Sequence, residues 1–225
     1  MSLPIAILAS GNGTNAQAMI DLMQAGVLDV DIRLVFSNRP NARVLERARA
    51  AGLPWKMEDH TKYASREAFD AVMVQAIRES GAEVIVLAGY MRLLTQGFLE
   101  AFPQKVINIH PSLLPAFGGG VHAGADAVEY GVKLSGCTVH FVDMKVDSGP
   151  VIIQAAVPCN AEDSTDDLMN RIHVLEHRIY PQALQWLAEG RVSVQGRHVH
   201  IAGADRELAK QPENCLVWPP LEKGF

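Results

Sequence analysis

The sequence predicts an α/β fold: a Rossmann-like, mostly parallel and twisted sheet with helices on both faces, followed by a mixed C-terminal extension. In the first half, short runs that are apolar on both faces alternate with longer amphipathic runs, as expected for parallel strands covered on both sides. After Pro111 the rhythm changes, and strand candidates follow one another with little helix between them. No internal repeat or low-complexity linker divides the sequence, so residues 1–225 are predicted to form a single domain.

The expected strands of the first half are short and apolar, and the expected helices carry one apolar face. Phe69, Met73 and Ile77, for example, recur at helical spacing. The expected strands are Pro4–Ala9, Ile32–Phe36, Val84–Ala88 and Val106–Ile109, and the expected helices begin near Asn15 and cover Asn41–Ala51 and Arg66–Glu79.

The second half predicts an antiparallel or mixed extension of the sheet. Cys137–Val142 and Val151–Val157 are the strand candidates. Ser164 and Asp167 form a Ser-x-x-Asp signal for a helix start, and apolar residues at helical spacing follow as far as Ile179. Residues from about 205 to 225 show no periodicity and are expected to be a surface tail.

Composition narrows the class of protein. Hydrophobic residues make up 48% of the chain and charged residues 20%, which is usual for a soluble globular protein. The net charge of −5 disfavours a nucleic-acid partner held by phosphate neutralisation. The three cysteines form neither a CxxC pair nor a disulfide framework, which fits a reducing cytoplasm. No apolar run approaches the length of about 18 residues that a membrane helix needs, and the N-terminus reads as a strand rather than a signal peptide.

A glycine loop follows the first expected strand. Residues 11–16 read Gly-Asn-Gly-Thr-Asn-Ala, which matches the dinucleotide fingerprint G-x-G-x-x-G/A. The acidic residue that should end the second strand is missing, since that strand ends Phe36-Ser37-Asn38, and no lysine completes a Walker loop. Such a loop at a helix N-terminus suits a single phosphate, but a tight turn without a ligand stays open as the alternative.

Asn108 and His110 are the strongest catalytic candidates. They lie two apart in an expected strand and therefore project to one face, and Pro111 places them near the strand's end, where ligands bind in open α/β sheets. Both side chains can donate a hydrogen bond to an oxyanion. Downstream, Asp147 precedes Ser-Gly-Pro in a turn, where its carboxylate could favour the imidazolium of His110. Taken alone, His110 also fits a buried core histidine and Asp147 a turn former.

The remaining histidines carry weaker signals. His122 lies in a glycine-rich loop, where a solvated side chain is the simpler interpretation. His198 and His200 share one face of an expected strand, but no Cys, Asp or Glu completes a ligand set beside them. The sequence therefore predicts no metal site.

Five motifs between about Ile5 and about Arg191 stand out together. They are LASGNGTN at 8–15, AGYMRLL at 88–94, NIHPSLLP at 108–115, GCTVHFVD at 136–143 and VDSGP at 146–150. Together they resemble the glycinamide ribonucleotide transformylases, a folate-dependent formyltransferase family of purine synthesis. The first loop resembles these transformylases rather than methionyl-tRNA formyltransferases, and the chain length disfavours both the latter and the formyltetrahydrofolate deformylases, which carry further domains.

The resemblance implies a formyltransferase fold, a function and a set of residue roles. The chain is expected to transfer the formyl group of 10-formyltetrahydrofolate to the amine of glycinamide ribonucleotide, in the cytoplasm, as a monomer or homodimer, without metal, membrane or nucleic acid. The N-terminal half would hold the ribonucleotide phosphate and the C-terminal half the folate cleft. The implied residues are Asn108, His110 and Asp147 for catalysis, Gly13, Thr14 and Asn15 for the phosphate, Asn108 and Glu176 for the ribonucleotide, and Arg66, Met91, Arg92, Leu93 and Leu94 for the folate.

The sequence departs from the family pattern at two places, and one other class of function stays open as an alternative. Residues 117–122 read Phe-Gly-Gly-Gly-Val-His, about one residue longer than the family's loop. His173 stands where a glutamine is common. Arg66 and Glu176 also fit solvated helix charges. A non-catalytic nucleotide-binding or NAD-linked protein is the alternative reading, which the missing acidic residue after the second strand and the combination of Asn-x-His with Asp-Ser-Gly-Pro disfavour.

Overall fold

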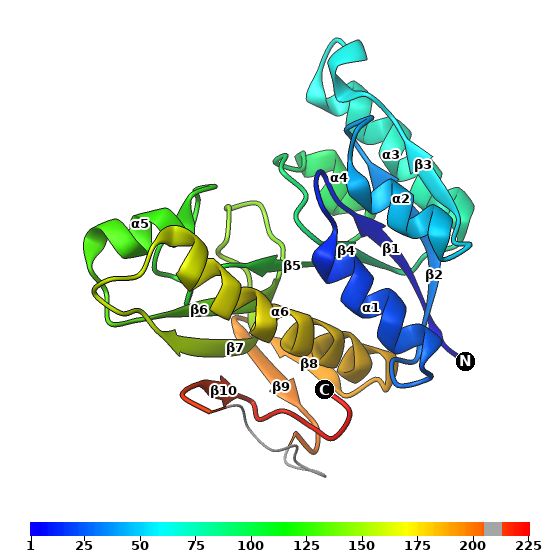
Figure 1. Cartoon of the computed structure of the whole chain (residues 1–225). Helices are drawn as coiled ribbons and strands as arrows, with labels where there is room; N and C mark the ends of the chain where they lie inside the picture. The colour runs from blue at the N-terminus through cyan, green and yellow to red at the C-terminus, as the bar shows by residue number, and fades with distance from the viewer. Residues whose placement is uncertain (205–212) are drawn as a thin grey trace. The chain divides into compact units, whose positions relative to one another are not determined.

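The computed structural model describes residues 1–204 and 213–225 (Figure 1). Its backbone contacts group the chain into two compact units, and the single domain expected from the sequence stays a prediction. Unit 1 comprises Met1–Asn108 and Val142–Met144, and unit 2 comprises Ile109–Phe141 and Lys145–Phe225. Within the described ranges, no helix combines the length and apolarity needed to cross a membrane.

Unit 1 is built on parallel strands in the order β5-β4-β1-β2-β3. This confirms the predicted parallel sheet. The short strand β3, the 3-10 turn and helix α4 were not predicted. The elements are β1 Leu3–Leu8, α1 Thr14–Gln24, β2 Val30–Ser37, α2 Arg43–Ala50, β3 Trp55–Met57, a 3-10 turn His60–Lys62, α3 Arg66–Ser80, β4 Val84–Leu87, α4 Gln96–Ala101 and β5 Val106–His110, whose last two residues belong to unit 2.

Helices cover both faces of this sheet because its strands alternate between two apolar sides. Ala6 and Leu8 of β1 join Phe69 and Met73 of α3 in one buried cluster. The intervening Ile7 is equally buried but points to the opposite face, which α1 and α2 cover, since each contacts β2 and they contact each other. The expectation of helices on both faces is thereby confirmed.

Unit 2 carries the antiparallel part of the fold. Strand β7 pairs antiparallel with β6 on one side and with β10 on the other, while β8 and β9 form a separate hairpin. The predicted mixed extension is confirmed in this form. The elements are α5 Ala123–Tyr130, β6 Leu134–Phe141, β7 Val151–Pro158, α6 Thr165–Ala188, β8 Val192–Gln195, β9 His198–Ile201 and β10 Leu216–Trp218.

Helix α6 begins where the sequence predicted. The Ser164 hydroxyl accepts the backbone N–H of Asp167, and the Asp167 carboxylate accepts the backbone N–H of Ser164 in return, which satisfies two amides that a helix start leaves unpaired. Its apolar stripe, including Leu168, Ile172 and Ile179, is buried, and the helix packs on β6 and β7.

Residues 213–225 of the expected surface tail are anchored to unit 2 at two buried positions. Val217 is 3% exposed and Leu221 is fully buried. A bidentate ion pair joins Arg191 to Glu222, with N–O distances of 3.0 and 2.6 Å, and the Glu222 N–H donates to the Gln182 side chain. This segment is therefore held against the C-terminal half of α6. Residues 205–212 of the expected tail lie outside the described residues.

Candidate active site

His110 and Asp147 form a close pair in unit 2. The His110 ring is 6% exposed at the end of β5, and its Nδ1 lies 3.4 Å from Asp147 Oδ2. Its Nε2 lies 3.0 Å from the carbonyl oxygen of Phe117. A carbonyl oxygen can only accept, so Nε2 carries a proton here, and the Asp147 carboxylate faces Nδ1 on the other side of the ring. The pair therefore has the geometry of an acid–base site.

The Asp147 carboxylate is shared by three groups. Besides His110, its Oδ2 accepts the Gly119 N–H at 2.8 Å, and its Oδ1 lies 3.7 Å from Nε2 of the buried His140. Asp147 itself has a φ of 50°, a left-handed backbone that Asp tolerates better than most residues. Sequence reasoning missed His140. The motif TVHFVD contains it, but a histidine in a strand of buried residues has no signature of its own.

The segment after β5 is fixed on the antiparallel strands of unit 2. The Thr138 hydroxyl donates to the carbonyl of Ser112 and accepts the N–H of Leu114, at 2.7 and 3.1 Å. The Gln154 amide donates to both Thr138 and the Leu114 carbonyl. These bonds fix the start of the loop whose next residues, 117 and 119, contact the histidine–carboxylate pair.

Asn108 precedes His110 by two residues in β5, and the strand ends directly before Pro111, as predicted. The alternation of a strand puts the two side chains on the same side of its backbone. Asn108 is half-buried and His110 buried.

The glycine loop opens α1 in unit 1. Gly13 is the helix N-cap with a φ of 74°, and no described side chain caps this end, so the first-turn amides point away from the helix without in-helix acceptors. A side chain at Gly13 would bring its Cβ to 2.6 Å from Val44. Packing against α2 thus requires glycine whether or not a ligand binds, which is the tight-turn alternative that the sequence left open.

The polar side chain at the end of β2 makes hydrogen bonds within the protein, where a dinucleotide-binding protein has an acid for the ribose. Asn38 stands where a dinucleotide-binding protein has an acid, and it is buried. Its side-chain oxygen accepts the Ser10 hydroxyl at 2.6 Å, and its side-chain nitrogen lies 3.3 Å from Nδ1 of His60. The Ser10 oxygen in turn accepts the N–H of Met91 at 2.9 Å. This network connects the glycine loop to residues 91–94.

Residues 91–94, expected at the folate, lie beside α3. Asp70 of α3 accepts both the N–H and the hydroxyl of Thr95 at 2.8 Å, and the Arg92 guanidinium carbon lies 5.1 Å from the centre of the Phe69 ring. Met91 and Leu93 are 57% and 55% exposed. Arg66, which is also exposed, begins α3 one turn before Asp70. Residues 66, 69 and 70 share a helix face, so unit 1 brings Arg66 to the side that meets this segment.

Glu176 lies on α6 in unit 2 and is buried, so it is not the solvated helix charge that the sequence left open. Burial raises the pKa of the Cys137 thiol of β6 well above its usual range, and the nearby negative charge of Glu176 adds to this. The rings of His173 and His177 stack one turn apart, with centres at 6.4 Å. His173 therefore occupies the turn directly before Glu176, where the family's glutamine is expected.

The other predicted histidines stay outside these sites. His122 is the exposed N-cap residue of α5, and His198 and His200 lie on one exposed face of β9, as predicted. Among the described residues, no group of three or more His, Cys, Asp or Glu is placed to hold a metal ion. A metal-free reaction stays a prediction.

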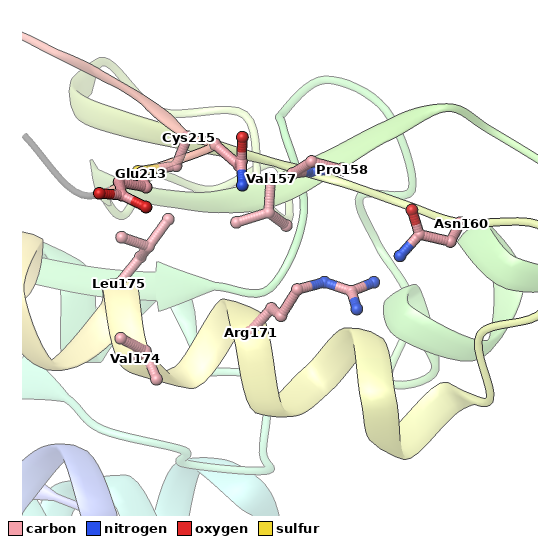
Figure 2. A pocket seen from close by; sticks show the side chains of 9 residues that line it. Val157, Pro158, Asn160, Arg171, Val174, Leu175, Glu213 and Cys215 are labelled. Atoms are coloured by element: carbon pink, nitrogen blue, oxygen red, sulfur yellow. The ribbon is translucent and has the colours of Figure 1, made fainter.

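A separate cavity of about 470 Å³ lies in unit 2 (Figure 2). Val174 and Arg171 of α6 form one wall, and Val157 and Asn160 lie across from them, with the Arg171 guanidinium extending toward Asn160. Arg171 also pairs with Asp163, which lowers the pKa of that carboxyl to about 2. None of the lining residues belongs to the catalytic or binding sets above.

Comparisons with known proteins agree with these motifs. The family model described as formyl transferase matches residues 3–184. The chain belongs to the formyl transferase family. This formyl transferase is 43% identical over 199 residues to the phosphoribosylglycinamide formyltransferase of Escherichia coli, covering 88% of the chain and 93% of that protein.

In other relatives, the segment that matches this chain is part of a longer protein. The chain is 44% identical over 188 residues to the trifunctional purine biosynthetic protein adenosine-3 of Drosophila melanogaster, covering 83% of the chain but only 14% of that protein's length. The solved structure of glycinamide ribonucleotide transformylase 1 from Symbiobacterium toebii superposes with a TM-score of 0.87 at 48% identity, covering 89% of this formyl transferase and 94% of that chain. The fold and family expected from the sequence are thereby confirmed.

Proposed function

We propose that this formyl transferase moves the formyl group of 10-formyltetrahydrofolate onto the amine of glycinamide ribonucleotide, a step of purine biosynthesis. The observation that carries the proposal is the His110–Asp147 pair at 3.4 Å, with Asn108 two residues away in the same strand, in a chain of this family. We propose the cytoplasm as its location, consistent with three free cysteines, and a monomer or homodimer as its form.

The reaction requires a group that stabilises an oxyanion and a group that moves a proton. When the neutral amine attacks the formyl carbon, the formyl oxygen becomes negative. Asn108 and protonated His110 would donate hydrogen bonds to it. The amine must lose one proton and the departing folate nitrogen must gain one, and Asp147 would carry that proton between them.

Binding would be divided between two other sets of residues. The amides of Gly13, Thr14 and Asn15, at the uncapped start of α1, suit the phosphate of the ribonucleotide, with Glu176 on the ribonucleotide as well. Residues 91–94 and Arg66 suit the folate: the exposed Met91 and Leu93 offer apolar surface, and Arg66 offers a positive charge to a carboxylate tail.

The test is a transfer assay with both substrates, followed by absorbance of the deformylated folate. His110→Ala and Asn108→Ala should each lower kcat by roughly 10²- to 10³-fold, the usual cost of losing one oxyanion donor, with the unfolding free energy nearly unchanged. A wild-type protein that transfers no formyl group to the ribonucleotide refutes the proposal. Thermal-shift measurements address the NAD-linked alternative: NAD stabilising the protein while folate analogues do nothing would favour it.

A further inference from the structure

Helix α2 contacts the glycine loop through two residues one turn apart. Val44 packs on Gly13, and its N–H donates to the carbonyl of Gly11 at 3.2 Å. Arg47 reaches the same loop through its guanidinium. Its Nε donates to the backbone carbonyl of Asn12 at 2.8 Å, and its Nη2 donates to the Asn12 side-chain oxygen at 2.8 Å.

The same guanidinium also donates a hydrogen bond to α1. Arg47 Nη1 donates to the side-chain oxygen of Gln17 at 3.1 Å, and Gln17 closes the first turn of α1 by donating its N–H to the Gly13 carbonyl at 2.9 Å. A guanidinium is rigid and planar, so three bonds made by one such group fix the directions of their acceptors relative to one another. The loop backbone and the first turn of α1 are thus fixed to one side chain.

The bond to the Asn12 carbonyl has a further consequence for Gly13. The peptide unit between these residues is planar and trans, so its C=O and its N–H point in opposite directions. Holding the Asn12 oxygen toward Arg47 therefore turns the Gly13 N–H away from Arg47. This N–H belongs to the group of amides assigned above to the phosphate, and its direction depends on a residue 34 positions further along the chain.

We propose that Arg47 is a positioning residue for the phosphate site: it sets the direction of the Gly13 amide so that the loop accepts a phosphate monoester. The inference rests on the proposed function, since it concerns the same ribonucleotide site. A purely structural role, docking α2 onto α1, predicts a loss of stability without selectivity between substrates. The two roles therefore differ in which Michaelis constant changes.

The chain provides a matched control on the same helix. Arg49 has the same charge, but its guanidinium lies over the Trp55 ring at 4.8 Å instead of on the loop. Arg47→Gln should raise the KM for glycinamide ribonucleotide by roughly 10- to 100-fold, as expected when a charge-assisted hydrogen bond that orients the site is lost. The KM for the formyl folate should stay within about twofold, and Arg49→Gln should change neither constant by more than about twofold.

Two further variants separate geometry from charge. Arg47→Lys keeps the charge but cannot make the three-way contact, so its KM for the ribonucleotide should resemble that of Arg47→Gln. Asn12→Ala removes the side-chain acceptor and keeps the backbone carbonyl, so its effect should be milder. A full rescue by lysine, or Asn12→Ala as impaired as Arg47→Gln, would overturn the assignment to the backbone carbonyl.

Inorganic phosphate provides a readout that is independent of turnover. Its dissociation constant, measured by calorimetry, should rise by a similar factor in Arg47→Gln and stay unchanged in Arg49→Gln. Equal phosphate affinities in the two variants, or equal increases in both Michaelis constants, overturn the inference. Urea unfolding checks that the variants are folded. A wild-type protein that binds phosphate in an Arg47-dependent way but transfers no formyl group would refute the proposed function and leave this inference standing.

Discussion

Replacing Asp147 by Asn removes a charge from the proposed active site with little change of shape. The amide oxygen can still accept the Gly119 N–H that Asp147 accepts at 2.8 Å, so the loop should keep its conformation. What is lost is the attraction between the carboxylate and the His110 ring, which carries a positive charge on the proposed mechanism, across 3.4 Å. For two unit charges at that distance the attraction is about 1 kcal/mol in water and about 5 kcal/mol at an effective dielectric constant of 20.

These limits correspond to roughly fivefold and a few thousandfold in rate, because each 1.4 kcal/mol is a factor of ten. Since the His110 ring is buried and Asp147 is partly exposed, we expect a fall in kcat of roughly a hundredfold. Because the same attraction is present in the folded protein, the unfolding free energy of the variant is measured beside its kcat. The assay is steady-state formyl transfer with both substrates, and Asp163→Asn serves as the control because it removes a carboxylate from unit 2 outside the histidine–carboxylate cluster.

The same variant has a spectroscopic signature. With the carboxylate gone, the chemical shifts of the His110 ring protons should change, because the negative charge 3.4 Å from Nδ1 is removed, and NMR detects this directly. An Asp147→Asn protein with wild-type turnover and unchanged His110 ring shifts would refute the coupling. Asp147 would then be only the acceptor that holds Gly119.

Three further predictions concern stability, each measured by urea unfolding. Gly13→Ala should destabilise by about 1–3 kcal/mol, since its Cβ would lie 2.6 Å from an α2 side chain at a φ of 74°, whereas Gly11→Ala, with nothing within 4 Å, should cost little. Leu221→Ala should cost about 2–4 kcal/mol because Leu221 is fully buried, and Leu216→Ala, at 68% exposure, should cost far less. A hydrogen bond from the α6 guanidinium lowers the pKa of the Asp163 carboxyl from 3.8 to about 2, so its contribution is present above pH 4 and lost as the pH falls toward 2. Asp163→Asn should remove that part of the acid dependence.

Periodicity predicted most of the parallel half of the fold well, because the core strands β1, β4 and β5 are largely buried on both faces and the longer helices show one apolar stripe. Periodicity missed the elements that are too short to show a pattern or that are identified only by pairing with a strand far away in the sequence. Strand β3 has only three residues, the first of them exposed. Strand β10 lies between a segment without periodicity and two prolines, and it is identified by its pairing with β7 rather than by its own sequence.

The candidate site was predictable where residue chemistry and position coincide. Asn108, His110 and Asp147 carry recognisable patterns, and the structure places the last two in contact. His140 and Arg47 carry none: one is a buried strand residue and the other an arginine on a charged helix face. Their roles depend on which atoms the fold brings within reach, such as the Asn12 carbonyl 35 positions away from Arg47 in the chain.

The hydrogen bond between His110 Nε2 and the Phe117 carbonyl affects how strongly His110 binds the substrate compared with the transition state. On the proposed mechanism, Nε2 is the donor for the formyl oxygen, yet the protein already offers it an acceptor at 3.0 Å. A ground-state formyl oxygen resembles that carbonyl in strength, so exchanging one for the other gains almost nothing. The oxygen becomes a much stronger acceptor once it is negative. The Phe117 carbonyl thus competes with the substrate for the Nε2 proton, and only the charged oxygen of the tetrahedral species displaces it with a clear gain. The hydrogen bond from His110 therefore stabilises the transition state more than the bound substrate.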